Sequence, residues 1–439
     1  MKKKLNILKY FYIACLTWLS IVITACDSDD TKDKRPAAVD HSTSKYFPPI
    51  GKQEIGDCTC WSSCYYYNTY TQARDHDLDA SSGDPDAICS PRFLFSLISQ
   101  GHYGAECTEH AMERLSVYGC ATVSQYPMDT HWEKWPGEKT RIAALRNRTG
   151  KLHKVRADTP EGLEEVKQHI ANGGCAVTRG LFRENYPSYG DSAAGPGINN
   201  GVMYAKTGRN WLRHSLCICG YDDERAYIDE RDGQMYKGAF LIANSEGQDW
   251  GSCNSTGTGT KGFLWVAYNM FLEGQFGLYD HDDNPYTDPC FDNPDYPTIY
   301  YHEDLPDYVP TLYAVIGINH PKRNMLQLTG GVGSNDQPNF QSSDVIEFTD
   351  SGEIPIIDTN SVVIDLSDGV DLIGSDGIEQ VFIELVVHSS SVTAASITSI
   401  IVYYDPESNM NYQKIIPLNQ TLRVKPGEKG YLSVDLIDN

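Results

Sequence analysis

Positive charge is scarce in this sequence. Its 439 residues include 36 Lys and Arg against 59 Asp and Glu, which gives a formal net charge of −23. Nucleic acids and anionic lipid surfaces are bound through basic patches, so this balance argues against both as partners. The acidic composition instead suits a soluble domain.

Long apolar runs are equally scarce, and the one that stands out is at the start of the chain. Residues Tyr10 to Ile23 are apolar and follow the basic stretch Met1-Lys2-Lys3-Lys4. This run is too short to span a bilayer and has the layout of a secretory signal. It ends in Ile23-Thr24-Ala25-Cys26, which resembles a bacterial lipobox, so Cys26 is predicted to be lipidated and to become the mature N-terminus. The alternative is an ordinary signal peptide that happens to end near a Cys.

The predicted cleavage also sets the expected location. Removing residues 1–25 takes away four lysines and no acid, and leaves 32 basic and 59 acidic residues, a net charge of −27. Similar acidic runs to Asp27-Ser28-Asp29-Asp30 follow the lipid Cys in surface lipoproteins of Bacteroidota. The mature protein is therefore expected at a bacterial membrane, the outer one by this analogy, held only by its lipid. The sequence specifies no oligomeric state.

Metal-binding signals are missing or incomplete. Cys58, Cys60 and Cys64 form a Cys-x-Cys-x3-Cys run, but no second ligand pair follows at the spacing that zinc sites use. Asp280 to Asn284 begins like a calcium loop, yet Pro285 replaces the required Gly and no Glu occupies the twelfth place. No metal and no cofactor is predicted.

The sequence does contain a thiol, an imidazole and an amide in separate, distinctive segments. These are Gly56-Asp57-Cys58-Thr59-Cys60-Trp61, Arg213-His214-Ser215-Leu216 and Ala243-Asn244-Ser245-Glu246. An imidazolium lowers the pKa of a neighbouring thiol and so favours the nucleophilic thiolate. A side-chain amide can orient that imidazole as Asp does in serine enzymes. The three residue types therefore suit a cysteine-nucleophile site.

Beyond these three residues, a stretch of about residues 45–275 resembles bacterial papain-like cysteine peptidases. The chain order Cys, His, Asn is that of papain, where the later residues follow by roughly 130–150 positions; here the separations are 156 and 186, so insertions are required. Further segments resemble the family in the right order: Gln53, Cys89–Leu94, Ala111–Gly119 with Ser124–Pro127, Val166–Val177 and Lys261–Val266.

The resemblance implies a role for each residue. Cys58 would be the nucleophile, His214 the base, Asn244 its orienting amide, and Gln53 a donor to the oxyanion. Cys60 is the competing nucleophile, because Cys60-Trp61 copies the Cys-Trp pair of eukaryotic members. Counting from Cys58 puts small residues two and five places later and an aromatic at three, as in the family's helix, whereas counting from Cys60 puts Tyr65 where a small residue packs. Cys58 is therefore preferred.

Two residues depart from the family pattern. Glu246 replaces the Trp that shields the His–Asn hydrogen bond, and Glu54 replaces the Gly after the oxyanion Gln. A carboxylate near the imidazole favours its charged form. The predicted function is a lipid-anchored thiol peptidase acting on peptides or proteins through an acyl-enzyme; the alternative is a catalytically impaired lipoprotein of the same fold that serves as a binding or adhesion module.

The chain is predicted to contain two domains on a tether. Residues 1–26 are the signal and lipid-anchor Cys, 27–44 the tether, 45–280 the peptidase domain, 281–310 a linker and 311–439 a β-sandwich-like domain. The fold class is an α+β papain-like two-lobed catalytic domain followed by an all-β sandwich-like C-terminal domain. The last segment is assigned from short apolar runs with a strand period, as in Val381, Ile383, Leu385 and Val387, separated by turn residues.

Several elements of the peptidase domain are also predicted. Cys58 should begin a helix, where the helix dipole stabilises a thiolate. Other helices are expected over 109–118 and from Pro160, a common first helical residue, to near Gly173. Residues 181–210 are expected to form a long loop.

The cysteine count gives one more expectation. Of 13 cysteines, Cys15 lies in the signal and Cys26 carries the lipid, so eleven remain. If ten of these pair, one free thiol is left, and a free thiol in an exported protein requires a functional explanation. Cys58 supplies that explanation.

Overall fold

The computed structural model describes most of the chain after the predicted signal and anchor. The described residues are 35–99, 107–183, 197–208, 210–250, 262–276, 296–334, 343–347, 361–374, 378–405, 414–418 and 420–436. Cys26 and the rest of the predicted signal and lipobox lie outside them.

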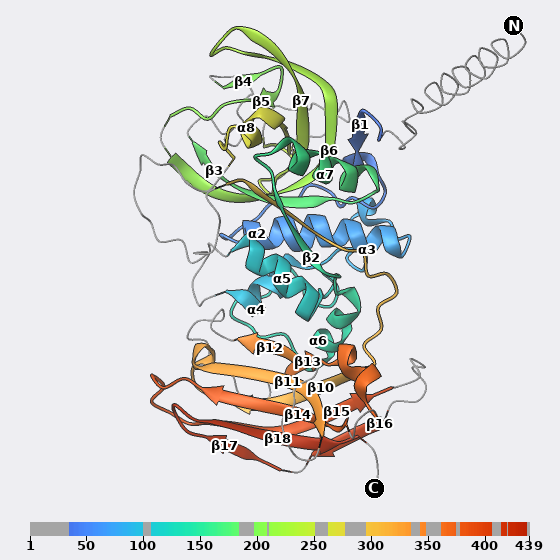
Figure 1. Cartoon of the computed structure of the whole chain (residues 1–439), viewed down its shortest axis with the longest axis vertical. Helices are drawn as coiled ribbons and strands as arrows, with labels where there is room; N and C mark the ends of the chain where they lie inside the picture. Colours follow the sequence, from blue (N-terminus) through green and yellow to red (C-terminus); the bar gives the residue numbers. More distant parts are fainter. Residues whose placement is uncertain are drawn as a thin grey trace, which may run out of the picture. The chain divides into compact units, whose positions relative to one another are not determined.

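A large, mostly antiparallel sheet forms one layer (Figure 1). Its strand order is β2-β9-β3-β6-β7-β8-β5-β4, β1 pairs with β6, and β5 pairs with β8 in parallel. The strands are β1 Ala38–Asp40, β2 Leu152–Arg156, β3 Ala176–Arg183, β4 Ile198–Asn199, β5 Val202–Met203, β6 Asn210–Asp229, β7 Gln234–Ala243, β8 Phe263–Ala267 and β9 Thr298–His302.

Strand β9 corrects the predicted linker. It lies within 281–310, yet it pairs with β2 and β3 inside the large sheet. Ile299, Tyr300 and His302 are buried there. The segment Thr298–His302 is rich in residues that favour strands, but it follows a stretch dense in Asp and Pro that hides the pattern. The linker prediction is wrong for these residues.

The predicted loop over 181–210 is also partly wrong. Strand β3 continues to Arg183, so it includes the first residues of the predicted loop. The two-residue strands β4 and β5 lie near the C-terminal end of that loop. Residues 184–196 lie outside the described part.

One long helix carries Cys58 and crosses the face of the sheet. It consists of α2 (Cys58–Cys60), the π-helical stretch η2 (Trp61–Asn68) and α3 (Thr69–Asp75). Ser62 and Ser63 both donate side-chain hydrogen bonds to the carbonyl oxygen of Thr59. Hydroxyls that bind carbonyls one turn back compete with the regular helical bonds, which accounts for the widened turn. The helix predicted to start at Cys58 is confirmed.

The other helices begin at residues that suit helix starts. In α4 (Pro91–Ile98) and α7 (Pro160–Ala171) a Pro follows a capping hydroxyl, Ser90 or Thr159, that accepts a bond from the backbone of the first turn. The helices predicted over 109–118 and from Pro160 are confirmed. The remaining helices of the described residues are α5 Thr108–Tyr118, α6 Glu138–Ala144 and α8 Tyr268–Leu272, with short 3-10 turns η1 His41–Thr43, η3 Ala80–Ser82, η4 Leu145–Asn147, η5 Arg323–Met325 and η7 Ser367–Leu372.

The C-terminal part consists of two antiparallel sheets, as the strand period predicted. One has the order β13-β10-β15-β16 with β17 paired to β15, and the other the order β12-β11-β14-β18. Val381, Ile383, Leu385 and Val387 of β14 are all buried. The strands are β10 Leu312–Asn319, β11 Leu326–Ser334, β12 Ser343–Glu347, β13 Val362–Asp365, β14 Ile378–Val387, β15 Ala395–Tyr404, β16 Lys414–Leu418, β17 Leu422–Val424 and β18 Lys429–Asp435.

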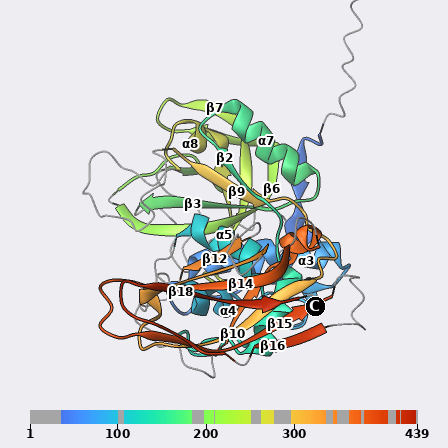
Figure 2. The ribbon, with the colours of Figure 1, turned by 60° about the horizontal axis from the view of Figure 1, so that its bottom comes forward.

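Helices α4, α5 and α6 connect the two parts. Helices α4 and α5 contact the helix that carries Cys58, whereas α5 and α6 contact β13 of the C-terminal sheets (Figures 1 and 2). Residues 38–439 form one compact unit. The helical layer therefore supports the Cys58 helix on one side and the C-terminal sheets on the other.

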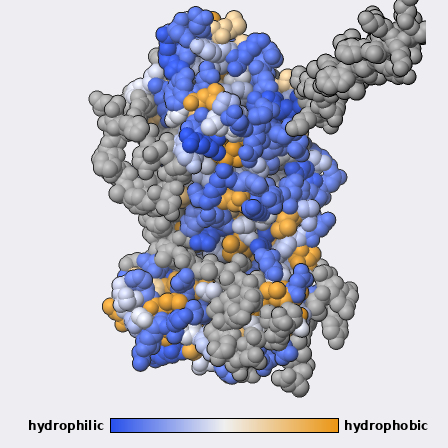
Figure 3. Space-filling view, viewed as in Figure 1, coloured by the Kyte–Doolittle hydropathy of each residue, from blue (hydrophilic) through white to orange (hydrophobic). Residues whose placement is uncertain are grey.

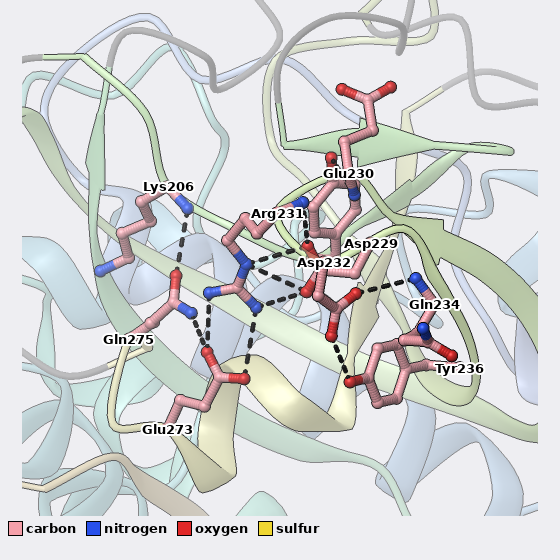
Figure 4. A network of polar contacts seen from close by, with 10 residues as sticks. Lys206, Asp229, Glu230, Arg231, Asp232, Gln234, Tyr236, Glu273 and Gln275 are labelled. Atoms are coloured by element: carbon pink, nitrogen blue, oxygen red, sulfur yellow. Dashed lines mark hydrogen bonds and ion pairs between the residues drawn. The ribbon is translucent and has the colours of Figure 1, made fainter.

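A polar network holds the tip of the long β6–β7 hairpin against the end of α8 (Figure 4). Arg231 donates hydrogen bonds to both carboxylate oxygens of Asp229 and, through Nη1, to Glu273 at 2.9 Å. Gln275 donates to Glu273 and accepts a 3.2 Å bond from the backbone of Lys206. These contacts join three segments that are far apart in the sequence.

The surface in Figure 3 is mainly hydrophilic where it is coloured, with hydrophobic residues in small separate groups. Within the described part of the chain, no helix has the length and apolar character needed to cross a membrane.

Candidate active site

Cys58 is the first residue of α2, directly after Asp57 at the N-cap position. Its side chain is half-buried. Burial alone would raise the pKa of the thiol, but the charge and hydrogen bond of His214 outweigh it. The backbone of Ser215 and the charge of Arg179 act in the same direction, so the pKa of Cys58 is lowered from its ordinary value. The site therefore favours the thiolate.

His214 lies on β6, and its imidazole is buried. Its Nε2 is 2.6 Å from Oδ1 of Asn244. Burial lowers the pKa of this imidazole, yet the charge and hydrogen bond of Cys58, the bond to Asn244 and the charge of Glu246 together raise it. A thiol with a lowered pKa beside an imidazole with a raised pKa forms a thiolate–imidazolium pair over an intermediate pH range.

Asn244 directly follows β7, and its side chain is buried. The backbone N–H of Ser245 donates to Asn244 Oδ1 at 2.8 Å, which identifies that atom as the acceptor and His214 Nε2 as the donor. The carbonyl oxygen of Asn244 accepts a 2.8 Å bond from the hydroxyl of Tyr66. Because Tyr66 lies on the helix that carries Cys58, this bond fixes the helix against the strand that positions the amide.

Gln53 lies in the loop before the helix, beside the Asn244 segment. Its backbone N–H donates to the carbonyl oxygen of Ser245 at 2.8 Å, and its Oε1 accepts a 2.5 Å bond from the Ser245 hydroxyl. Its Nε2 donates to the carbonyl oxygen of Ile55 at 3.0 Å. The structure thus places Gln53 beside the residue that follows Asn244, with its amide nitrogen engaged by the backbone of Ile55.

The competing cysteine is in a different position. Cys60 is fully buried in the hydrophobic core, whereas Cys58 is the cysteine that contacts His214. The geometry therefore favours Cys58 over Cys60 as the residue that works with the imidazole.

The two residues that depart from the family pattern lie in different environments. Glu246 is half-buried, and its charge raises the pKa of His214. Glu54 is exposed. Lys52 and Glu246 pair as an isolated β-bridge, so the loops before Cys58 and after Asn244 lie next to each other.

Sequence reasoning missed a chain of hydroxyls behind the site. The hydroxyl of Ser215 lies 3.2 Å from that of Thr59 and 2.5 Å from that of Thr108, and all three residues are buried. Thr59 and Ser215 directly follow Cys58 and His214, so the chain ties the residue after the thiol to the residue after the imidazole. The position of Thr59 after Cys58 and of Ser215 after His214 was the only feature of the sequence that pointed to these hydroxyls.

Asp57 was also missed. Its side chain is 1% exposed, and one carboxylate oxygen, Oδ1, is buried without a hydrogen-bond partner. Burial raises the pKa of this carboxyl to about 6, against an opposing effect from the charge of Arg92 and a hydrogen bond from Trp61. A buried carboxyl therefore lies one residue before the thiol.

The structure has fewer disulfides than the pairing of ten cysteines would require. No disulfide joins eight cysteines of the described part, namely Cys58, Cys60, Cys64, Cys89, Cys120, Cys175, Cys217 and Cys219. Cys107 is in a disulfide. Within the described residues, no group of three or more His, Cys, Asp or Glu side chains is arranged to hold a metal ion.

Several solved structures of cysteine proteases are similar to this chain. Procathepsin L 3 of Tenebrio molitor larval midgut matches with a TM-score of 0.35 and 15% identity, covering 54% of this chain and 66% of that one. The bromelain protease from Ananas comosus matches with a TM-score of 0.38 and 13% identity, covering 62% of this chain and 100% of that one. The Carica candamarcensis cysteine protease CMS1MS2 matches with a TM-score of 0.33 and 17% identity, covering 53% of this chain and 88% of that one.

All three matches are at 13–17% sequence identity with TM-scores of 0.33–0.38. The chain spans slightly less than two thirds of the length of the Tenebrio proenzyme. No family model matches the sequence, and no curated protein matches it.

Proposed function

We propose that this protein is a papain-like cysteine-type peptidase that cleaves peptide bonds through an acyl-enzyme formed on Cys58. The observation that supports the proposal most strongly is the contact between Cys58 and His214, with the imidazole held by Asn244 at 2.6 Å. Nucleophile, base and orienting amide are the three parts that this chemistry requires.

In the first step the thiolate of Cys58 attacks the carbonyl carbon of the scissile peptide bond. The carbon–oxygen π electrons move to the oxygen, which becomes an oxyanion. The backbone N–H of Cys58 is one donor to this oxygen, because the first N–H groups of a helix have no partner within the helix. Gln53 is the proposed second donor, and it must turn its amide nitrogen from Ile55 or use its other N–H.

In the second step the tetrahedral intermediate collapses and the carbon–nitrogen bond breaks. The imidazolium of His214 gives its proton to the leaving amine, and Asn244 keeps the ring in the required orientation. Water, or another amine, then attacks the thioester while His214 takes up its proton, which releases the acyl group and restores the thiol.

The alternative is a catalytically impaired protein that keeps the fold as a binding module. The engagement of Gln53 Nε2 with Ile55 and the half-buried Glu246 beside the imidazole favour it. The two proposals differ in whether Cys58 reacts as an activated thiol.

An epoxide probe of the kind that alkylates papain-type thiols tests this difference. The mature protein should be labelled, Cys58→Ala should lose both labelling and peptide hydrolysis, and Cys60→Ala should keep most of each. His214→Ala should lower kcat/KM by roughly 10²–10⁴-fold, since it removes the general base. Hydrolysis that persists in folded Cys58→Ala would reject the peptidase proposal, and a wild-type protein that is folded but neither labelled nor active would favour the binding module.

We further propose that the enzyme is anchored to the bacterial membrane by a lipid on Cys26, with peptides or proteins as substrates. The order Ile23-Thr24-Ala25-Cys26 after an apolar run supports the anchor. Cys26→Ser should move the protein from the detergent phase to the aqueous phase in a partition assay. If the variant stays in the detergent phase, the lipid is not on Cys26.

A further inference from the structure

Three cysteines outside the active site meet at one point in the core. Cys64 lies in η2, Cys89 just before α4, and Cys120 just after α5. All three are buried. The thiols of Cys64 and Cys120 both point at the carbonyl oxygen of Ser90, at 3.3 and 3.8 Å. Three segments separated in sequence therefore place their sulfur atoms together.

The sulfur atoms of Cys64 and Cys120 are 2.7 Å apart. Non-bonded heavy atoms attract best at roughly 3.5–4.0 Å, so this separation is short for two thiols that only touch. A disulfide bond is about 2.05 Å long, so the two facing sulfurs need to move only a little closer to form one.

We propose that Cys64 and Cys120 form a disulfide in the mature protein, with Cys89 beside it as a thiol able to exchange with it. Bond formation balances as a thiol–disulfide exchange with a small-molecule disulfide as oxidant. The two thiols lose two protons and two electrons to form one sulfur–sulfur bond, and the oxidant is reduced to two thiols. Because the side chains are buried in the folded protein, the bond forms during folding, before the core closes.

Cys89 has the chemistry of an attacking thiol. The amide nitrogen of Asn68 donates to its sulfur at 3.6 Å. When Cys64 and Cys120 are joined they no longer donate to Cys89, but the hydrogen bonds of Thr69 and Asn68 remain, and both lower the pKa of the Cys89 thiol. Thiol–disulfide exchange proceeds by attack of a thiolate on a disulfide sulfur. A minor population in which Cys89 has replaced one partner is therefore expected.

The bond would act on the helix that carries the nucleophile. Cys64 lies six residues after Cys58 on that helix, and the bond would join it to the segment that follows α5, 56 residues further along the chain. A cross-link of this kind removes conformations from the unfolded chain. It would hold the Cys58 helix against the helical layer whether or not the protein is a peptidase.

Peptide mapping without reductant tests the proposal directly. The full chain is secreted into the periplasm of an expression host, denatured with iodoacetamide present, digested and analysed by mass spectrometry. We expect a linked peptide joining Cys64 to Cys120 as the main product, while Cys175, Cys217 and Cys219 are alkylated as internal controls. Alkylation of both Cys64 and Cys120 in most molecules, or a main link through Cys89, would overturn the proposal.

Thermal unfolding supplies a second measurement. Reduction should lower the Tm of the wild type by a few degrees more than that of Cys64→Ala/Cys120→Ala, since the Cys107 disulfide is present in both and cancels. The variant Cys175→Ala, which removes a buried thiol from another part of the core, should respond to reduction as the wild type does. Equal shifts in the wild type and the double variant would also overturn the proposal, and because neither readout uses activity, its failure leaves the peptidase proposal untouched.

Discussion

At the scale of single residues, the environment of His214 decides over which pH range the thiolate and the imidazolium coexist. Cys58 has a lowered pKa and His214 a raised one. The thiolate is therefore present above a lower pH than for a free thiol, and the imidazolium persists to a higher pH than for a free imidazole. The pH profile of kcat/KM should therefore be bell-shaped, with both its acid and its alkaline limb set by the coupled titration of Cys58 and His214.

Glu246 should set the alkaline limb of this profile. Its negative charge raises the pKa of His214, so Glu246→Gln should move the alkaline limb to lower pH without shielding the imidazole. Glu246→Trp should produce the same shift and also raise kcat, because an indole at this position keeps water from the His214–Asn244 bond. The measurement is a kcat/KM profile of the three forms on one peptide substrate. An alkaline limb that stays in place in both variants would mean that Glu246 does not act on His214.

Asp57 should lower the stability of the protein at neutral pH. Its folded pKa of about 6 is above the unfolded value of 3.8, so its stabilising contribution is complete below pH 3.8 and is lost as the pH rises through 6. At neutral pH the buried carboxylate then costs on the order of 3 kcal/mol. Asp57→Asn should therefore raise the free energy of unfolding in urea at pH 8 and leave it nearly unchanged at pH 4.

The matched control for this variant is Glu54→Gln, which removes an exposed carboxylate from the same loop. It should change the free energy of unfolding by less than about 0.5 kcal/mol at either pH. A gain for Asp57→Asn that is the same at pH 4 and pH 8 would show that the carboxyl does not titrate as described.

The catalytic candidates could be predicted from the sequence more readily than the residues that surround them in the fold. Cys58, His214 and Asn244 occur in a family order with recognisable neighbours, and the structure brings them together. The hydroxyl of Thr108 could not be assigned, because its contact with Ser215 depends on how α5 packs against β6. Asp57 looked like any loop acid, since burial is a property of the folded chain.

At the scale of elements, the tip of the β6–β7 hairpin depends on one arginine. Arg231 is 45% exposed and pairs with Asp229, which is buried, and with Glu273 (Figure 4). The hydrogen bonds of Arg231 lower the pKa of Asp229. Since the folded pKa is depressed, this stabilisation is present above pH 3.8 and is lost as the pH falls through the folded value.

Arg231→Ala should destabilise the protein by about 1–2 kcal/mol at pH 7, because it leaves the Asp229 carboxylate buried without its main partner. The loss should shrink at pH 3, where Asp229 becomes protonated in the variant. Urea unfolding at both pH values measures this. Lys237→Ala on β7 removes an exposed ion pair with Glu224 and is the control; its effect should stay below about 0.5 kcal/mol. Equal losses in the two variants would contradict the role given to Arg231.

Elements with strong local signals were predictable, and those that depend on distant partners were not. Helix α7 has a capping Thr159 and a Pro at its first position, and the alternation in β14 shows its buried face. Strand β9 has only five residues in an Asp- and Pro-rich region and is completed by pairing with β2 and β3. Such pairing joins segments about 150 residues apart in the case of β2, which no local window contains.

At the scale of the whole molecule, a buried ion pair joins the helical layer to the C-terminal sheets. Arg148 Nη1 lies 2.6 Å from Oδ2 of Asp365, whose side chain is fully buried. The hydroxyl of Tyr308 donates to the same oxygen at 2.6 Å, and Ser367 donates to Oδ1 through both its backbone and its hydroxyl. The carboxylate is thus fully hydrogen-bonded by both parts of the molecule.

Arg148→Ala should destabilise the protein by roughly 3–5 kcal/mol, because removing one partner leaves a buried charge uncompensated. The two parts should still unfold in one transition, since the packing of α5 and α6 on β13 remains. Calorimetry and urea unfolding measure both quantities. Lys429→Ala, which removes a more exposed pair with Glu384 on the C-terminal sheets, is the control and should have little effect. Unfolding of the wild type in two steps would contradict the description of residues 38–439 as one compact unit.

The division into a helical-and-sheet part and an all-β part could be predicted from composition and strand period. Their common core could not, because the buried contacts of Arg141 with the backbone of Val363 and of Trp135 with Ser361 are made between residues more than 200 positions apart. Neither arginine nor tryptophan at these positions carries a local signal for such a contact.

The burial of the cysteines has a practical consequence for counting functional molecules. Among the cysteines of the described part, Cys58 is half-buried and the other free thiols are fully buried. A maleimide added in less than one equivalent to the native protein should therefore modify Cys58 ahead of every buried thiol of the described part, as peptide mapping of the labelled product would reveal. When the maleimide is instead added in small excess, the plateau fraction of Cys58 labelled would measure what share of a preparation carries an intact nucleophile, independently of any knowledge of the substrate.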